Sequence, residues 1–166
     1  FFFESNTGYF VMEFLEGNSL KDYLAIRGGR ISFQEALTLL LPTMEALDAV
    51  HQEGMLHRDI APDNIFITSD GVAKLIDFGA ARFRREDETK SVRTIVKPGY
   101  APMEQYTSQA AQGPWSDVYA MGATIYRAIT GITPLDAPTR AMNDELRSPA
   151  QLGCQLPNNA DYAIMR

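Results

Sequence analysis

The chain has 166 residues, with 15 lysines and arginines, 21 aspartates and glutamates, and a formal net charge of −6. Its 45% hydrophobic and 22% charged residues are ordinary for a globular protein long enough to bury a core, which excludes wholesale disorder. The acidic balance lacks the basic surface that attracts duplex DNA or an anionic membrane, so we expect no nucleic-acid partner.

Cysteine usage and hydropathy indicate the compartment. Cys154 is the single cysteine and cannot form an internal disulfide, and no Cys/His cluster is spaced for zinc. No apolar run is long enough to span a bilayer. We therefore expect a reducing, cytoplasmic location. The abrupt ends of the sequence suggest a piece of a longer chain, and that parent could be anchored to a membrane through a segment not present here.

The N-terminal part predicts a strand followed by a short helix. Tyr9–Leu15 is rich in aromatic and β-branched residues, which favours a strand, and Glu16-Gly17-Asn18 then favours a turn. Ser19 is placed to cap a short helix that runs through Leu24, and Gly28-Gly29 ends it.

The clearest predicted helix follows. Ser32 and Glu35 have the spacing of a capping box, and the apolar residues after them recur on one helical face. Pro42 is expected to kink this helix and Gly54 to end it. His51, near its end, receives no role.

A hairpin, a loop and an apolar helix complete the predicted elements. Asp70-Gly71 lies between two apolar runs and is the strongest short hairpin signal in the chain. Residues 83–99 are charged and lack periodicity, which predicts a long functional loop. Trp115–Thr130 is almost wholly apolar and predicts a buried helix that Gly131 ends.

Three clusters of polar residues carry the candidate chemistry. His57-Arg58-Asp59 is followed by Asn64, then by Asp77-Phe78-Gly79, and later by Pro102-Met103-Glu104. The hairpin should return Asp77 to the side of Asn64. These two side chains offer the hard oxygen ligands that suit Mg²⁺ bound partly through substrate phosphates, and Asp59 is left to accept a proton.

These clusters resemble the protein kinases, whose motifs include H-R-D-x-x-x-x-N and D-F-G. Pro62–Ile65 and Gly99–Tyr106 most resemble the bacterial-type (Hanks-type) serine/threonine kinases. The resemblance implies an α+β, mainly α-helical fold: a kinase C-lobe over residues 15–166, truncated near its C-terminus, with residues 1–14 as a remnant of the N-lobe strands and the start of the hinge.

The resemblance also implies roles for single residues. Asp59 would be the catalytic base, and Asn64 and Asp77 would hold Mg²⁺ on ATP. Asp117 would brace the catalytic loop, and His57 would be a packed structural histidine. Further structural roles fall on Phe78, Gly79 and Glu104. The residues implied in binding the nucleotide are Met12 as gatekeeper, Glu13 and Leu15 in the hinge, Phe66 beneath adenine, and Asp63.

The charged stretch Arg82–Lys97 would be the activation loop. Phosphorylation of Thr89, Ser91 or Thr94 would create a group that pairs with Arg58 and Arg82 and orders the loop. The implied partner is a protein substrate, and self-association for autophosphorylation of the loop is a further expectation. The alternative is a solvated loop without a regulatory role.

Two positions depart from the family. Ala61 stands where these kinases usually have a lysine, two residues after the catalytic aspartate, and Lys97 stands where they usually have a threonine. We expect Lys97 to supply the missing ammonium near the transferred phosphate, and a lysine at 61 should then partly rescue Lys97→Ala. The alternative is an exposed loop lysine.

The missing parts leave other functions open. No glycine-rich loop and no strand lysine precede Tyr9, so we expect the 166-residue piece alone to be inactive and the parent to be the enzyme. A pseudokinase or binding scaffold with the same fold is one alternative; the retained Asp59, Asn64 and Asp77 argue against it, and Ala61 keeps it open. A small-molecule phosphotransferase is another, disfavoured by the Pro102–Glu104 segment and the long loop.

Overall fold

The structure is a computed structural model, and it describes residues 2–5, 7–9, 11–77, 82–83, 96–107 and 109–166. Its helices are α1 (Leu20–Ile26), α2 (Phe33–Gln52), α3 (Pro114–Thr130), α4 (Ala137–Met142) and α5 (Asn158–Ile164). Its strands are β1 (Phe2–Glu4), β2 (Thr7–Tyr9), β3 (Gly17–Ser19), β4 (Met55–Leu56), β5 (Ile65–Thr68), β6 (Ala73–Leu75) and β7 (Arg82–Phe83). Short 3-10 turns cover Pro62–Asn64, Met103–Tyr106 and Ala150–Leu152.

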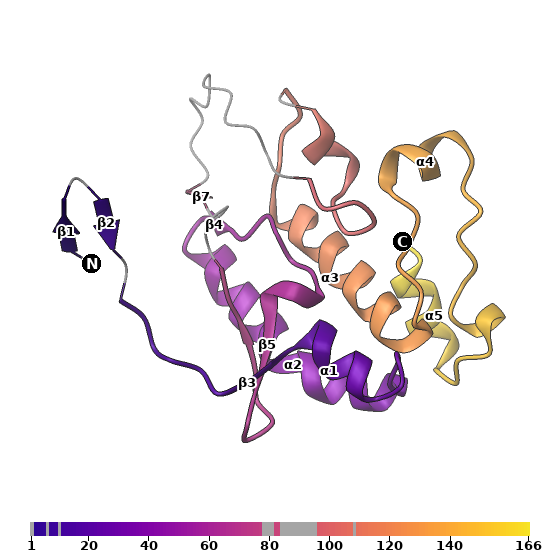
Figure 1. Ribbon diagram of the computed structural model, residues 1–166. Coiled ribbons are helices and arrows are strands. Elements are labelled where there is room, and N and C mark those ends of the chain that lie inside the picture. The colour runs from indigo at the N-terminus through magenta and orange to yellow at the C-terminus, as the bar shows by residue number, and fades with distance from the viewer. Residues whose placement is uncertain (1, 6, 10, 78–81, 84–95, 108) are drawn as a thin grey trace.

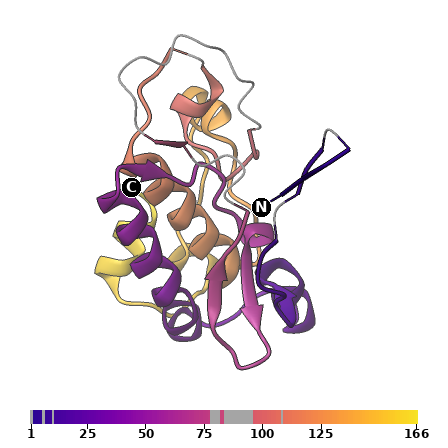
Figure 2. The same cartoon turned by 90° about the vertical axis from the view of Figure 1, so that its left-hand side faces the viewer.

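Small antiparallel sheets flank the helices. Strands β3, β5 and β6 form one sheet in that order, β4 pairs with β7, and β1 pairs with β2. Figures 1 and 2 show the β1–β2 hairpin standing apart from the helices, joined to them by an extended segment. The mainly helical α+β class predicted from the resemblance is the class observed.

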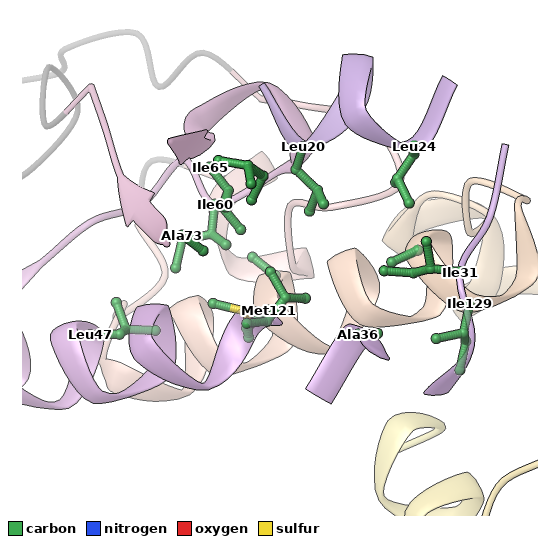
Figure 3. Packing of buried hydrophobic residues seen from close by; sticks show 14 residues of the cluster. Leu20, Leu24, Ile31, Ala36, Leu47, Ile60, Ile65, Ala73, Met121 and Ile129 are labelled. Carbon is green, nitrogen blue, oxygen red and sulfur yellow. The ribbon is translucent and has the colours of Figure 1, made fainter. Parts of the chain in front are cut away.

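The core lies where α2 and α3 meet each other and the β3–β5–β6 sheet. Helix α2 contacts both α3 and β6, and α1 contacts β3 and β5. In Figure 3 the apolar side chains of these elements point toward one another, with Met121 of α3 near their centre. This core joins the segments on either side of residues 57–64 and so fixes the base of that loop.

The predicted N-caps begin helices α1 and α2. The Ser19 hydroxyl accepts a hydrogen bond from the backbone N–H of Asp22 at 3.1 Å, and Ser32 accepts one from Glu35 at the same distance. Each satisfies an N–H that the first helical turn leaves without a partner. Helix α2 continues through Pro42 to Gln52, and Gly54 follows it with a φ of +72°.

The strand predicted over Tyr9–Leu15 is wrong. Strand β2 ends at Tyr9, and residues 11–16 form no strand; Val11, Met12 and Phe14 are exposed. The predicted turn is wrong as well, because Gly17–Ser19 is strand β3, paired with β5. Gly17 has a φ of +149°, and a Cβ there would lie 2.0 Å from the carbonyl oxygen of Ile67, so only glycine permits this close pairing.

Helix α3 is amphipathic and is not buried on all sides, which corrects the prediction. Met121 and Ile129 face the core, whereas Val118 is 61% exposed and Trp115 also reaches the surface. The helix ends at Gly131, whose φ of +78° makes a left-handed C-cap. Across the part of the chain that the structure describes, no helix combines the length and hydrophobicity that crossing a membrane would require.

Candidate active site

A buried carboxylate at the start of α3 holds the loop that follows β4. Asp117 is only 1% exposed, and its Oδ1 accepts a hydrogen bond from the backbone N–H of Arg58 at 2.7 Å. Its Oδ2 accepts one from the backbone N–H of His57 at 2.9 Å and lies 2.8 Å from Nε2 of His51. Two consecutive backbone amides are therefore fixed by one anion, in the geometry that the resemblance implied for Asp117.

His51 is a residue that the sequence analysis missed. It lies in the last turn of α2, and its partner Asp117 is 66 positions further along the chain. Its contact with this almost fully buried carboxylate links the end of α2 to the start of α3. A histidine at a helix end was the available signal, but nothing local indicated the distant carboxylate.

The loop backbone at Arg58 is held in a strained conformation. Arg58 has a φ of +68°, in the left-handed region that costs a non-glycine residue about 1–3 kcal/mol when surrounding structure imposes it. Its N–H donates to Asp117, and its carbonyl oxygen accepts a hydrogen bond from Nε2 of Gln105 at 2.8 Å. Both peptide groups are fixed, so the direction of the chain entering Asp59 is fixed too.

His57 connects this loop to the strand that leads to Asp77. Its ring is fully buried; Nδ1 accepts a hydrogen bond from the backbone N–H of Asp59 at 3.4 Å, and Nε2 donates to the carbonyl of Ile76 at 3.3 Å. A ring that accepts through one nitrogen and donates through the other is neutral. Burial lowers the pKa of His57, which agrees with that neutral form.

Asp59 and Asn64 are in direct contact. The amide Nδ2 of Asn64 donates to the Asp59 backbone carbonyl at 2.8 Å and to carboxylate Oδ2 at 2.7 Å. Because the amide nitrogen is occupied by these two bonds, its oxygen Oδ1 is the atom left to act as a ligand. Asn64 is buried and Asp59 is half-buried, so the pair is held rigidly at the edge of the fold.

The β5–β6 hairpin returns the chain to this pair. Ile65 is opposite Leu75, and the backbone N–H of Ile76 donates to the Asn64 carbonyl at 3.0 Å, so the next residue, Asp77, follows beside Asn64. Asp77 is exposed and has a left-handed φ of +60°. This is the juxtaposition predicted from Asp70-Gly71, and Gly71 has the positive φ that such a turn requires.

The donor set at this edge fits Mg²⁺ bound through phosphates. One amide oxygen and one carboxylate are hard ligands, and Mg²⁺ commonly uses one or two protein ligands with substrate oxygens and water for the rest. Within the described ranges no group of three or more His, Cys, Asp or Glu side chains is placed to hold a metal, so a closed all-protein cage is not formed there.

Lys97 also reaches Asp59. Its Nζ lies 3.2 Å from Oδ1 of that carboxylate, with the two side chains 27% and 21% exposed. Ala61, by contrast, is fully buried and carries no charge. The ammonium of Lys97 therefore lies beside the predicted base, as we expected from the absence of a lysine at position 61. The catalytic role of Lys97 stays a prediction.

The segment after Lys97 is tied to α3 as well as to the loop. Glu104 accepts a hydrogen bond from the hydroxyl of Ser116 at 2.6 Å, and the neighbouring Gln105 is the residue that bonds the Arg58 carbonyl. This contact ties Glu104 to the start of α3, and the structural role expected for Glu104 stays a prediction. Gln105 and Ser116 were not singled out from the sequence.

The residues implied in nucleotide binding lie on exposed or half-buried surface. Met12 is 81% exposed, and Leu15 and Phe66 are half-buried. The other two form ion pairs: Glu13 with Lys74 at 3.0 Å, and Asp63 with Lys21, also at 3.0 Å. None of the described contacts tests their binding role.

The remaining predictions lie at or outside the limits of the described residues. Phe78, Gly79, Thr89, Ser91 and Thr94 fall outside them. The backbone of Arg82 is described: it belongs to β7 and is the partner of Leu56, which directly precedes His57. This pairing brings the start of the charged segment alongside the loop that contains Arg58.

Comparison with known proteins finds similar chains in one family. The family model for the protein kinase domain matches residues 1–163. The serine/threonine-protein kinase PknA of Mycobacterium tuberculosis is 38% identical over 167 residues, which cover 97% of this chain and 38% of that protein. A probable serine/threonine-protein kinase of Clostridium perfringens, CPE1738, is 26% identical over 173 residues, covering 98% of this chain and 24% of that protein.

A solved structure has the same fold. The apo form of PpkA-294 aligns with a TM-score of 0.73 and 36% sequence identity, over 92% of this chain and 55% of that one. The chain spans about a quarter to two fifths of the length of the two curated relatives above.

Proposed function

The chain belongs to the protein kinase family, among the bacterial serine/threonine kinases, and from that premise we propose that the full-length protein transfers the γ-phosphate of ATP to serine or threonine hydroxyls of proteins in a Mg²⁺-dependent reaction. The proposal concerns the whole protein, of which this chain supplies the catalytic loop and the residues around it.

One observation carries the proposal: the contact between Asn64 and Asp59 in a loop braced by Asp117. Phosphoryl transfer needs little covalent chemistry from the protein and depends on positioning and electrostatic stabilisation. A half-buried carboxylate with a fixed backbone on both sides meets the first requirement. It can align a hydroxyl and accept its proton without rearrangement of the loop.

Asp59, Asn64 and Asp77 would have separate roles in this reaction. Asp59 would accept a hydrogen bond from the substrate hydroxyl and take its proton as the new bond to phosphorus forms. Oδ1 of Asn64 and the carboxylate of Asp77 would hold Mg²⁺ against the nucleotide phosphates. When bound, the ion neutralises charge on the phosphate oxygens. His57 would keep the two loops at a constant separation through its contacts with the Asp59 N–H and the Ile76 carbonyl.

Regulation by phosphorylation is part of the proposal. Thr89, Ser91 and Thr94 are the candidate sites, and self-association would allow one copy to phosphorylate another. The antiparallel pairing of Arg82 with Leu56 supports a link between this segment and Arg58, because Leu56 lies two residues before Arg58. A phosphate of about −2 charge would be attracted to these guanidinium groups.

Mass spectrometry of the full-length protein tests the proposal. The protein is incubated with Mg²⁺·ATP and its residues 83–97 are searched for added phosphate, with dephosphorylated casein present as an external acceptor. We expect phosphate on the loop and on casein in the wild type, and loss of both in Asp59→Asn, since removing a general base typically lowers the rate about 10²- to 10⁴-fold. Equal labelling in Asp59→Asn, or none in the wild type, would refute it.

A further inference from the structure

The ammonium of Lys97 occupies one side of the Asp59 carboxylate while Asn64 occupies the other. Nζ lies 3.2 Å from Oδ1, and the Asn64 amide lies 2.7 Å from Oδ2. Neither side chain of the ion pair is fully exposed. A pair shielded in this way is screened less by salt and is held in one geometry better than a surface pair.

The backbone around Lys97 is fixed, which distinguishes it from a lysine on an exposed loop. The carbonyl of Lys97 accepts hydrogen bonds from the backbone N–H groups of Tyr100 at 3.1 Å and Ala101 at 3.0 Å. Gly99 within this turn is buried, with a φ of +84°, and a Cβ there would lie 2.7 Å from the Pro134 carbonyl oxygen. The turn thus packs against the segment after α3, and the backbone that carries Lys97 is fixed.

The geometry leaves hydrogen-bonding capacity for a second anion. An ammonium has three N–H donors, and among the described residues Asp59 is the one carboxylate that Lys97 pairs with. A substrate hydroxyl bonded to Oδ1 at ordinary hydrogen-bond distance would have its oxygen within about 6 Å of Nζ. The remaining donors can bind the phosphoryl group under attack by that oxygen if it lies on the Lys97 side of the carboxylate.

We propose that Lys97 is a catalytic residue that binds the transferred phosphoryl group through its ammonium while Asp59 orients the acceptor hydroxyl. The proposal rests on the proposed function. In the step, the hydroxyl oxygen forms a bond to the γ-phosphorus of ATP, and the bond from that phosphorus to the β–γ bridging oxygen breaks. ADP leaves with the electron pair, and the hydroxyl proton passes to Asp59. Lys97 stabilises the negative charge on the three equatorial oxygens.

Position 61 itself supplies no cation, and Lys97 is a cation that contacts Asp59. Ala61 is fully buried, and its carbonyl accepts the Asn64 N–H at 2.9 Å within the turn that positions Asn64. A lysine introduced at 61 would have to extend from a packed position, so Ala61→Lys risks misfolding. Lys97→Arg is a better test than Ala61→Lys of whether a positive charge is needed beside Asp59, because it keeps the charge at position 97.

The test compares Lys97→Met, Lys97→Arg and Asp59→Asn with the wild type in the full-length protein, with casein as acceptor. Arg27→Met is the matched control: it removes the ion pair between Arg27, which directly follows α1, and Glu35 of α2, both outside the catalytic loop. For Lys97→Met we expect kcat to fall about 10²- to 10³-fold with the KM for ATP within about threefold, the size of effect seen when one preorganised donor to a developing anion is removed. Lys97→Arg should recover at least about a tenth of the wild-type kcat.

Binding of a transition-state analogue gives a readout that does not depend on turnover. Calorimetry measures the affinity for Mg²⁺·ADP with and without aluminium fluoride, which mimics the phosphoryl group in transfer. Lys97→Met should weaken the aluminium fluoride complex about 100-fold and leave the affinity for Mg²⁺·ADP unchanged, since the interaction is made with the transferring group. Arg27→Met should change neither.

Opposite results would overturn the inference in distinguishable ways. If the wild type phosphorylates casein and Asp59→Asn does not, the proposed function holds. A Lys97→Met enzyme with a kcat within about twofold of the wild type would then refute the inference about Lys97 and leave the proposed function standing. Equal losses in Lys97→Met and Lys97→Arg, with a lowered melting temperature in both, would show that the residue is structural and would also refute it. No labelling by the wild type refutes the proposed function itself.

Discussion

Replacing Asp117 with asparagine removes one acceptor from the centre of the loop anchor and leaves the side-chain volume almost unchanged. The carboxylate accepts from the backbone N–H groups of His57 and Arg58 and contacts His51. An asparagine oxygen can take the place of Oδ2 and retain His57 and His51. Its NH₂ group then faces the N–H of Arg58, two donors with no acceptor between them.

The cost follows from these contacts. Losing one hydrogen bond to a charged acceptor costs about 1.5–3 kcal/mol, and leaving a buried donor unsatisfied adds about 1–3 kcal/mol. We therefore expect Asp117→Asn to lower the free energy of unfolding by about 2.5–6 kcal/mol. Arg58 would also lose the bond that imposes its φ of +68°, and relaxation toward an ordinary φ would displace Asp59.

Hydrogen exchange, thermal unfolding and phosphotransfer together measure this effect in the full-length protein. The amides of His57 and Arg58 should exchange faster, the transition of the kinase domain should fall by several degrees, and kcat should fall at least about tenfold. The control is Asp136→Asn at the N-cap of α4, where Asp136 accepts the N–H of Thr139 at 2.8 Å and asparagine caps equally well. A loss below about 1 kcal/mol with unchanged exchange at both amides would refute the anchoring role.

Three further perturbations have expected outcomes. Asn64→Ala should raise the Mg²⁺ concentration needed for half-maximal kinase activity about 10- to 100-fold, measured by Mg²⁺ titration; an unchanged requirement would exclude Asn64 as a ligand. Burial lowers the pKa of His57, so the unfolded chain binds a proton at this histidine more readily than the folded protein, and the folded state loses stability as the pH falls below 6.5. Between pH about 7.5 and 5 the melting temperature should therefore fall less steeply in His57→Phe than in the wild type. Equal slopes in the two proteins would contradict this. Ser32→Ala should lower the stability of the domain by about 1 kcal/mol in urea unfolding, because α2 loses its N-cap, and no change would show that water replaces it.

Local features of the fold could be predicted because their causes lie within a few residues. Ser19 and Ser32 cap helices through bonds that span three positions, and the Asp70-Gly71 turn sets the register that brings Asp77 back to Asn64. The strand predicted over Tyr9–Leu15 failed for the opposite reason. A strand is stabilised by pairing, and among the described residues 11–16 are not paired in a sheet, whatever their β-propensity.

Some contacts between distant positions could be expected from the resemblance to the kinases, and others could not be expected from the sequence at all. The pairing of Asp117 with the loop amides and the approach of Lys97 to Asp59 were expected from family positions, since no local pattern encodes a contact across tens of residues. His51 and Gln105 were missed, because a histidine at a helix end and a glutamine in a turn carry no signal of their partners. Burial of only one face of α3 depends on which elements pack against it.

A crystal structure of the full-length protein with Mg²⁺ and a non-hydrolysable ATP analogue would show whether Asn64, Asp77, Asp59 and Lys97 surround the metal ion and the nucleotide phosphates. We expect a metal ion bound by Oδ1 of Asn64 and the carboxylate of Asp77, with the terminal phosphate in contact with the ammonium of Lys97, which stays beside Asp59. A nucleotide whose phosphates bind away from these four side chains would contradict it.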